Sequence, residues 1–231
     1  ISEPGGVFRM ADNFVSNERD IGTIAGMIRA NGPTGGVYIG VGPEENLTYI
    51  TAVRPKMVFI VDIRRQAVMH HLLYKAIFEL SNDRADFISL LFAKPRPASL
   101  DANSNLLQIW QAFAAVPFDS ATAATNLARF RNHLTRTHGF TLTQDELDSF
   151  DHVYKSFVVF GPEITTNGGS GRGPAPNVEA LFARGAQIRA EITASGNVTA
   201  MPPGYSALGA PLNFVALTTV YDASGQMNSF L

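Results

Sequence analysis

The residues with the clearest potential for chemistry are two glycines and an aspartate, each placed where an apolar run ends. Gly40 and Gly42 follow the run Val37–Ile39, and Asp62 follows the run Met57–Val61, 22 residues after Gly40. Glycine lets the backbone turn sharply and approach a ligand with no Cβ in the way. An acid at this offset in a strand–turn–helix–strand unit accepts the hydroxyls of an adenosine ribose. The spacing therefore predicts a nucleoside pocket at the ends of two parallel strands. The alternative is that the glycines only close a tight turn and that Asp62 caps the next helix.

The residues after the turn indicate which nucleoside would fit. A dinucleotide-binding turn carries a third glycine, whereas Pro43, Glu44 and Glu45 follow here. Two carboxylates suit the positive end of the helix dipole, but they repel a pyrophosphate that needs the same backbone donors. S-adenosylmethionine has no phosphate, and its sulfonium and ammonium are attracted by nearby acids. Charge therefore favours the methyl donor over NAD, FAD or ATP.

Four motifs carry a resemblance to a known family: DNFVSNE at residues 12–18, GGVYIGVGPEEN at 35–46, DIRRQ at 62–66 and HLLYKA at 71–76. With these motifs the chain resembles an uncharacterised bacterial family of predicted methyltransferase-like proteins. More broadly, it is similar to the N-terminal part of class I S-adenosylmethionine-dependent methyltransferases. The resemblance extends over residues 12–97, and it implies a Rossmann-like sheet and a site for S-adenosylmethionine, with no particular acceptor or catalytic residue. Tyr38 stands where such enzymes often have an acid, and Glu44 where they often have a third glycine.

The predicted cofactor site draws its residues from three parts of the chain. The polar residues before the first helix are expected to close over the amino-acid end of the ligand, and the turn and the acid line the rest. The cofactor-binding residues predicted in this way are Asp12, Asn13, Asn17, Glu18, Gly40, Gly42, Glu44, Asn46, Asp62, Ile63 and Arg64. Ordinary helix capping by Ser16 and Asn17 is the alternative for the first group, and a favourable dipole interaction is the alternative for Glu44.

One dense group of acid–base side chains follows the second strand: His70, His71, Tyr74 and Lys75. His71 is a candidate general base, and the alternative is a half-buried histidine beside an apolar stripe. Adjacent histidines on a helix point about 100° apart and no carboxylate shares their spacing, so no metal site is predicted. Asp222 is a weaker candidate on the substrate side. Hydrolase motifs are missing from the sequence, and methyl transfer depends mainly on alignment of the reactants.

The elements that position these residues are expected to form one α/β domain over residues 1–231. Helices are predicted at 16–30 and from Asp62 to Leu80, followed by a helical insertion at 83–157, a flexible loop at 165–176 and a further strand at 213–220. A methyltransferase-type sheet usually has seven strands, so this chain is expected to lack its C-terminal strands. A truncated chain end, or a protein partner on the open sheet edge, would account for this.

Composition limits the remaining choices. Apolar residues make up 45% of the 231 residues and charged residues 16%, which is typical of a packed globular protein. A net charge of −2 does not indicate the excess of basic residues that is typical of nucleic-acid-binding proteins. No apolar run is long enough for a membrane span. The chain has no cysteine, which excludes disulfides, zinc thiolates and cysteine nucleophiles. We expect a soluble protein of the bacterial cytoplasm or periplasm that binds a small molecule. The alternative function is a non-catalytic accessory or interaction subunit that keeps the fold without the ligand.

Overall fold

The computed structural model of the protein describes residues 12–16 and 21–164. The described elements in chain order are α1 (Ile21–Asn31), β1 (Val37–Val41), α2 (Glu45–Val53), β2 (Met57–Val61), α3 (Arg65–Leu80), α4 (Arg84–Phe92), α5 (Leu106–Ala114), α6 (Ser120–Asn132), the π-helical turn η1 (His133–Thr137), α7 (Gln144–Phe160) and the 3₁₀ turn η2 (Gly161–Glu163). The predicted loop at 165–176, the predicted strand at 213–220 and Asp222 lie outside the described residues, as do Asn17 and Glu18.

The sheet consists of β1 and β2, which pair in parallel within the described part of the chain. Val37 lies opposite Met57, and Val41 lies opposite Val61. Helix α2 connects the two strands and α3 follows the second, which is the predicted strand–helix–strand–helix order. The described residues therefore form a mixed α/β structure with a two-stranded parallel sheet and seven α-helices.

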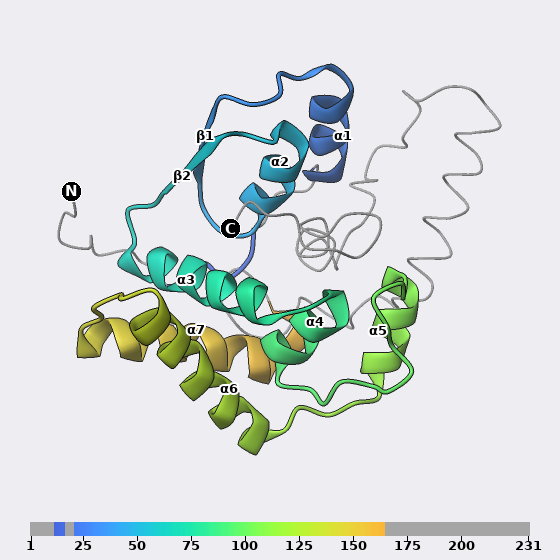
Figure 1. Cartoon of the computed structure of the whole chain (residues 1–231), viewed down its shortest axis with the longest axis vertical. Coiled ribbons are helices and arrows are strands. Elements are labelled where there is room, and N and C mark those ends of the chain that lie inside the picture. The colour runs from blue at the N-terminus through green and yellow to red at the C-terminus, as the bar shows by residue number, and fades with distance from the viewer. Residues whose placement is uncertain (1–11, 17–20, 165–231) are drawn as a thin grey trace.

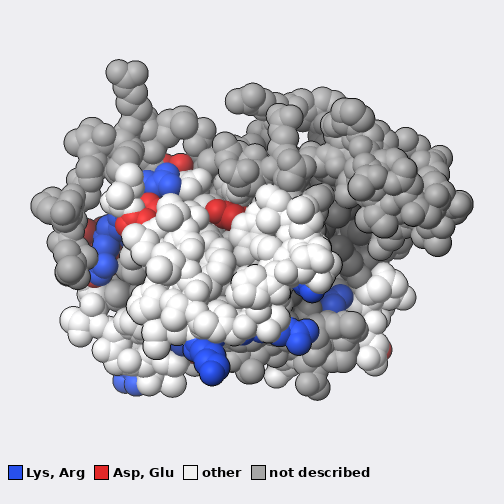
Figure 2. All heavy atoms as spheres, turned by 90° about the horizontal axis from the view of Figure 1, so that it is seen from above, with Lys and Arg blue, Asp and Glu red and all other residues white. Residues whose placement is uncertain are grey.

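The two faces of this sheet have different environments. Tyr38, Val58 and Ile60 point to the inner face and pack against the hydrophobic core. The alternate side chains point outward, and Ile39 and Phe59 are 70% and 50% exposed, although both are apolar. Seen from above the sheet end of the molecule, much of the described surface carries neither acidic nor basic side chains (Figure 2). Parallel strands are usually buried on both faces, so this outward apolar face is unusual.

A layer of helices lies beneath the sheet and contains most of the core. Figure 1 shows α3 crossing the molecule between the sheet and α2 on one side and α4, α6 and α7 on the other. Aromatic rings join α3 to α7: the Tyr74 ring lies 6.0 Å from the Phe157 ring, and His70 lies 5.4 Å from Phe157. Both helices therefore bury one side in the same aromatic cluster.

Local sequence signals set the starts of the lower helices. The Asp119 carboxylate accepts a hydrogen bond from the Thr122 backbone N–H (2.7 Å) at the start of α6, and Thr143 and Glu146 form a capping box at the start of α7. Residues 83–157 are helical as predicted, with α4, α5, α6 and most of α7, and α6 continues directly as η1. None of the helices in the described ranges is both long and apolar enough to cross a membrane.

Candidate functional site

The candidate site lies where both strands end at the same edge of the sheet. Because Val41 lies opposite Val61, the next residues, Gly42 and Asp62, leave the sheet side by side. Gly42 has a φ of +94°, a conformation that other residues adopt only with strain. The predicted turn and the predicted acid are therefore brought together.

The interior of the turn is filled by Asn46, from the first turn of α2. Its Nδ2 donates hydrogen bonds to the carbonyls of Val41 (3.1 Å), Gly42 (3.2 Å) and Pro43 (3.0 Å). Its Oδ1 accepts a hydrogen bond from the Tyr38 hydroxyl at 2.8 Å. Asn46 therefore fixes the turn from the inside, and Tyr38, which replaces the expected acid, supports it.

Gly40 is required by this packing. A Cβ at this position would lie 1.9 Å from Asn46 Oδ1 and 2.7 Å from Tyr38 Cε1. The missing side chain thus makes room for the asparagine amide of α2. The sequence indicated correctly that the backbone needs glycine here, while the group that approaches it in this structure belongs to the protein.

His71 ties α3 to the same turn. Its Nε2 lies 3.0 Å from the Gly42 carbonyl oxygen, and because a carbonyl only accepts, this nitrogen carries the proton. Burial lowers the pKa of His71, although the Gly42 hydrogen bond and the charge of Asp62 oppose this effect. The neutral form of the histidine is therefore favoured, and the nitrogen that faces the turn is engaged as a donor, so the role of general base stays a prediction.

Glu44 is completely buried at the start of α2. Both of its carboxyl oxygens lie within hydrogen-bond distance of the Ser16 backbone N–H, at 3.1 and 3.0 Å. Burial, and then the charge of Glu45, raise the pKa of Glu44 to about 8. This carboxyl group is therefore mostly protonated at neutral pH.

The N-terminal segment 12–16 crosses the starts of α2 and α3 and the middle of α7. The Asp12 carboxylate accepts hydrogen bonds from Gln66 of α3 (2.8 Å) and from His152 of α7 (3.1 Å). Asn13 is half-buried in this segment, and Phe14 beside it is buried. Together with the Ser16–Glu44 contact, these bonds hold the segment that contains Asp12 and Asn13 against α2, α3 and α7. The predicted contact of Asp12 and Asn13 with a ligand stays a prediction.

Asp62 stands at the predicted place, but its carboxylate is occupied. Its side chain is 4% exposed and accepts a 2.8 Å hydrogen bond from the Arg64 backbone N–H at Oδ1. The Arg64 guanidinium also reaches Oδ1 (3.3 Å) and, more weakly, Oδ2 (3.5 Å). Ile63 between them points to solvent. A ribose hydroxyl would reach Oδ2 only after the Arg64 side chain moves away.

A cavity of about 320 Å³ adjoins the site beneath the inner face of the sheet. Leu47 and Ile50 of α2, Val58 and Ile60 of β2, and His71 and Tyr74 of α3 contribute to its lining. The Tyr74 hydroxyl is buried and has no hydrogen-bond partner among the described residues, and its burial raises its pKa well above the ordinary value. Tyr74 was predicted only as an acid–base candidate, because a sequence does not indicate which hydroxyls are left without partners.

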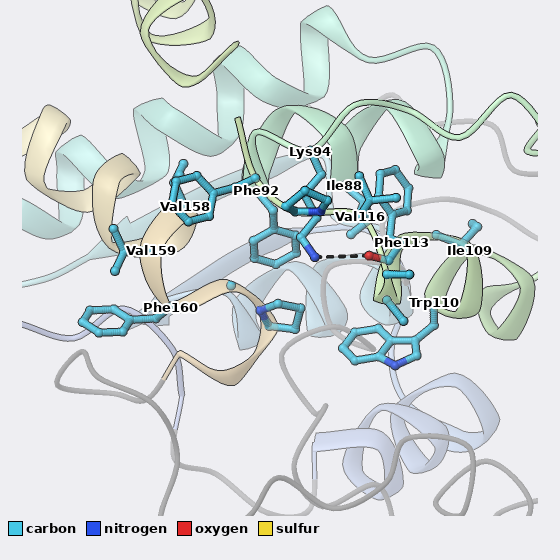
Figure 3. A pocket seen from close by; sticks show the side chains of 16 residues that line it. Ile88, Phe92, Lys94, Ile109, Trp110, Phe113, Val116, Val158, Val159 and Phe160 are labelled. Carbon is cyan, nitrogen blue, oxygen red and sulfur yellow. Dashed lines mark hydrogen bonds between the residues drawn. The ribbon is translucent and has the colours of Figure 1, made fainter. Parts of the chain in front are cut away.

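A second, larger pocket of about 580 Å³ lies between α4, α5 and the end of α7 (Figure 3). Its walls are apolar, with Trp110 and Phe160 on different sides, and Lys94 is its charged group. Lys94 Nζ donates to the Phe113 carbonyl oxygen at 3.2 Å, and partial burial lowers the pKa of Lys94. This pocket could not be predicted from the sequence, since its walls come from segments up to 74 residues apart, Ile88 to Pro162.

The fold and site thus define a mixed α/β protein with a glycine turn and an acid at the carboxyl edge of parallel strands. The model of a family described as "Domain of unknown function (DUF7790)" matches residues 13–125. That range includes the turn, Asp62, helices α1 to α5 and the first part of α6. None of the curated proteins compared with the chain matches it.

Proposed function

We propose that this chain is an S-adenosylmethionine-dependent methyltransferase-like protein with a Rossmann-like fold and an unidentified methyl acceptor. One observation carries the proposal: the strand register puts the Gly42 turn and Asp62 next to each other at the carboxyl edge of the parallel pair. Ligands of open α/β sheets bind outside this edge. The helical layer α4–α7 is, in this proposal, an insertion into a larger sheet.

The charges around the turn support a ligand without phosphate. Glu45, at the N-terminus of α2, would repel a pyrophosphate that needs the same backbone donors, and the Glu44 carboxyl group beside it is buried and mostly protonated at neutral pH. The carbonyl groups of the turn accept hydrogen bonds from Asn46 and His71, neither of which is a lysine or an arginine. These features disfavour a nucleotide phosphate and are compatible with a sulfonium ligand.

The residues at the edge fit S-adenosylmethionine if one side chain moves. Asp62 Oδ2, which is 3.5 Å from the Arg64 guanidinium, would accept a ribose hydroxyl once the guanidinium leaves. Segment 12–16 lies over the starts of α2 and α3, from where Asp12 or Asn13 would meet the amino-acid end of the ligand. S-adenosylmethionine supplies the activated methyl group when bound, and the residues of the chain hold the reactants in line.

A second function, that of a non-catalytic accessory or interaction subunit, is favoured by a different observation. The Asp62 carboxylate is engaged by Arg64, and the turn is filled by Asn46, so both features have a role without a ligand. The outward apolar face of β1 and β2, which includes Ile39 and Phe59, would then receive a protein partner.

Calorimetric titration with S-adenosylmethionine separates the two functions. Asp62→Ala should weaken binding at least about 10-fold, because a hydrogen bond to a charged group contributes about 1.5–3 kcal/mol. Arg64→Ala should strengthen binding by up to about fivefold, because the competing partly exposed ion pair is worth at most about 1 kcal/mol. Arg129→Ala, at an exposed position of α6, is the matched control and should bind like the wild type.

The absence of heat at millimolar ligand for the wild type and for Arg64→Ala would refute the methyltransferase proposal and leave the accessory function. Binding that Asp62→Ala does not change would also refute it, since the ligand would then sit elsewhere.

A further inference from the structure

A cluster of one carboxylate and two imidazoles lies away from the glycine turn. Glu79 is in the last turn of α3, His133 begins η1, and His138 follows it. Glu79 Oε2 lies 2.7 Å from His133 Nε2 and 2.5 Å from His138 Nε2. One ligand atom from each of the three residues lies within 4.8 Å of the other two. Two imidazole nitrogens and a carboxylate oxygen therefore converge on one point.

The π-helical turn brings the two histidines together. Residues five apart in an α-helix point about 140° from each other, because each residue advances the helix by about 100°. In η1 the helix is wider, and the His138 backbone N–H donates to the His133 carbonyl oxygen at 3.3 Å, which is the i→i+5 bond of a π-turn. The two imidazole rings then meet edge to face with centroids 5.0 Å apart. Such turns occur frequently at functional sites.

The Glu79 carboxylate is held in place by a lysine. Lys75, one turn earlier on α3, donates to one of its oxygens, Oε1. The other oxygen, Oε2, is therefore the one that faces the two histidines.

We propose that Glu79, His133 and His138 form a binding site for a divalent transition metal of the zinc class, through Oε2 and the two Nε2 atoms. Imidazole together with carboxylate suits Zn²⁺, Co²⁺ and Ni²⁺, whereas Mg²⁺ and Ca²⁺ prefer oxygen ligands throughout. Three protein ligands leave at least one coordination position for water, as in catalytic zinc sites. The His138 side chain is 29% exposed, so a metal ion reaches the site from solvent.

The geometry needs only a small adjustment. Tetrahedral ligands about 2.0–2.1 Å from a zinc ion are separated by about 3.3 Å, so the two Oε2–Nε2 contacts would lengthen by less than about 1 Å. Lys75 is the unfavourable feature, because its ammonium group would lie close to the metal ion and repel it. This repulsion makes a prediction that a purely hydrogen-bonded cluster does not make.

The test is a Co²⁺ titration of the untagged full chain after treatment with a chelator, followed by the visible absorption of bound cobalt. We expect saturable absorption that Zn²⁺ displaces and that Mg²⁺ does not. His133→Ala and His138→Ala should each weaken binding by more than about 10-fold, since loss of an outer-shell partner alone costs 10–100-fold. Lys75→Met should strengthen binding. His152→Ala, which removes a histidine outside the cluster, should leave binding unchanged.

Circular dichroism of each variant checks that the fold is retained, and His138→Asn at the exposed position serves if His138→Ala is unfolded. No cobalt absorption for the wild type at millimolar Co²⁺ would overturn the proposal. Equal binding by the wild type and both cluster variants would overturn it as well, because the metal would then lie elsewhere. The proposal does not depend on methyl-donor binding, and either one is able to fail alone.

Discussion

The buried Glu44 carboxyl group makes a strong and testable contribution to the pH dependence of stability. Its pKa rises from 4.5 to about 8 on folding, mainly because burial disfavours the charged form. Below pH 4.5 the group is protonated in both states, and folding carries no penalty. As the pH rises from 4.5 to 8, the unfolded chain releases this proton while the folded protein retains it, so stability falls; the loss is complete above pH 8.

The change that isolates this effect is Glu44→Gln, which keeps the shape of the protonated side chain and cannot ionise. At about 1.36 kcal/mol per pKa unit, the shift of Glu44 corresponds to a full effect of about 5 kcal/mol. The variant should therefore match the wild type within about 1 kcal/mol at pH 5, exceed its stability by about 3 kcal/mol at pH 7 and exceed it by about 5 kcal/mol at pH 9.

Urea denaturation at these three pH values, followed by circular dichroism, measures the difference. Asp145→Asn, which removes an exposed carboxyl group in the first turn of α7, is the control and should change the free energy of unfolding only slightly. A stability gap between Glu44→Gln and the wild type that stays the same from pH 5 to pH 9 would refute the reasoning, because the Glu44 pKa would then not change on folding.

Two further predictions concern the turn and the aromatic cluster. Gly40→Ala should lower the free energy of unfolding by about 1–3 kcal/mol through overpacking. Gly26→Ala, at a position where a Cβ meets nothing within 4 Å, should raise the free energy of unfolding by about 0.5–1 kcal/mol. Thermal unfolding of both variants measures these effects, and equal changes in the two variants would count against the explanation. Burial, and then the charge of His71, lower the pKa of His70 well below 6.5, so the stability that its neutral form gives is present above pH 6.5 and is lost as the pH falls. His70→Leu should remove this part of the acid sensitivity between pH 6.5 and 5, and a urea midpoint that falls as much in the variant as in the wild type would contradict the explanation.

Features with local causes could be predicted from the sequence. The position of Gly42 after an apolar run predicted the turn. The apolar pattern of residues 57–61 predicted β2, the strand that pairs with β1. Asp119 and Thr143 marked helix starts because capping involves only the next three residues. The adjacency of Gly42 and Asp62 followed from the same local order, since parallel neighbours end at one edge of a sheet.

The partners of buried polar groups could not be predicted in this way. Asn46 was predicted to bind the cofactor, and in the structure its amide donates to the carbonyl groups of the turn that precedes it. The sequence does not show this hydrogen bond, because it depends on the path of the chain between the two groups. The contact of Glu79 with His138 spans 59 residues and depends on a π-turn, which has no recognisable sequence pattern. Whether Asp62 holds a ligand or only Arg64 is a competition between two partners, and a sequence does not show its outcome.

The N-terminal segment joins parts of the molecule that are distant in the chain. The Ser16 backbone N–H donates to the Glu44 carboxyl group at the start of α2. The Asp12 carboxylate accepts hydrogen bonds from α3 and from α7. A protein shortened past Ser16 would lose all three anchors together, and the Glu44 side chain would face an opening to water in place of a backbone donor. Amide hydrogen exchange around residues 12–16 should therefore act as an early indicator of loosening at the whole strand edge, before the helical layer shows any change.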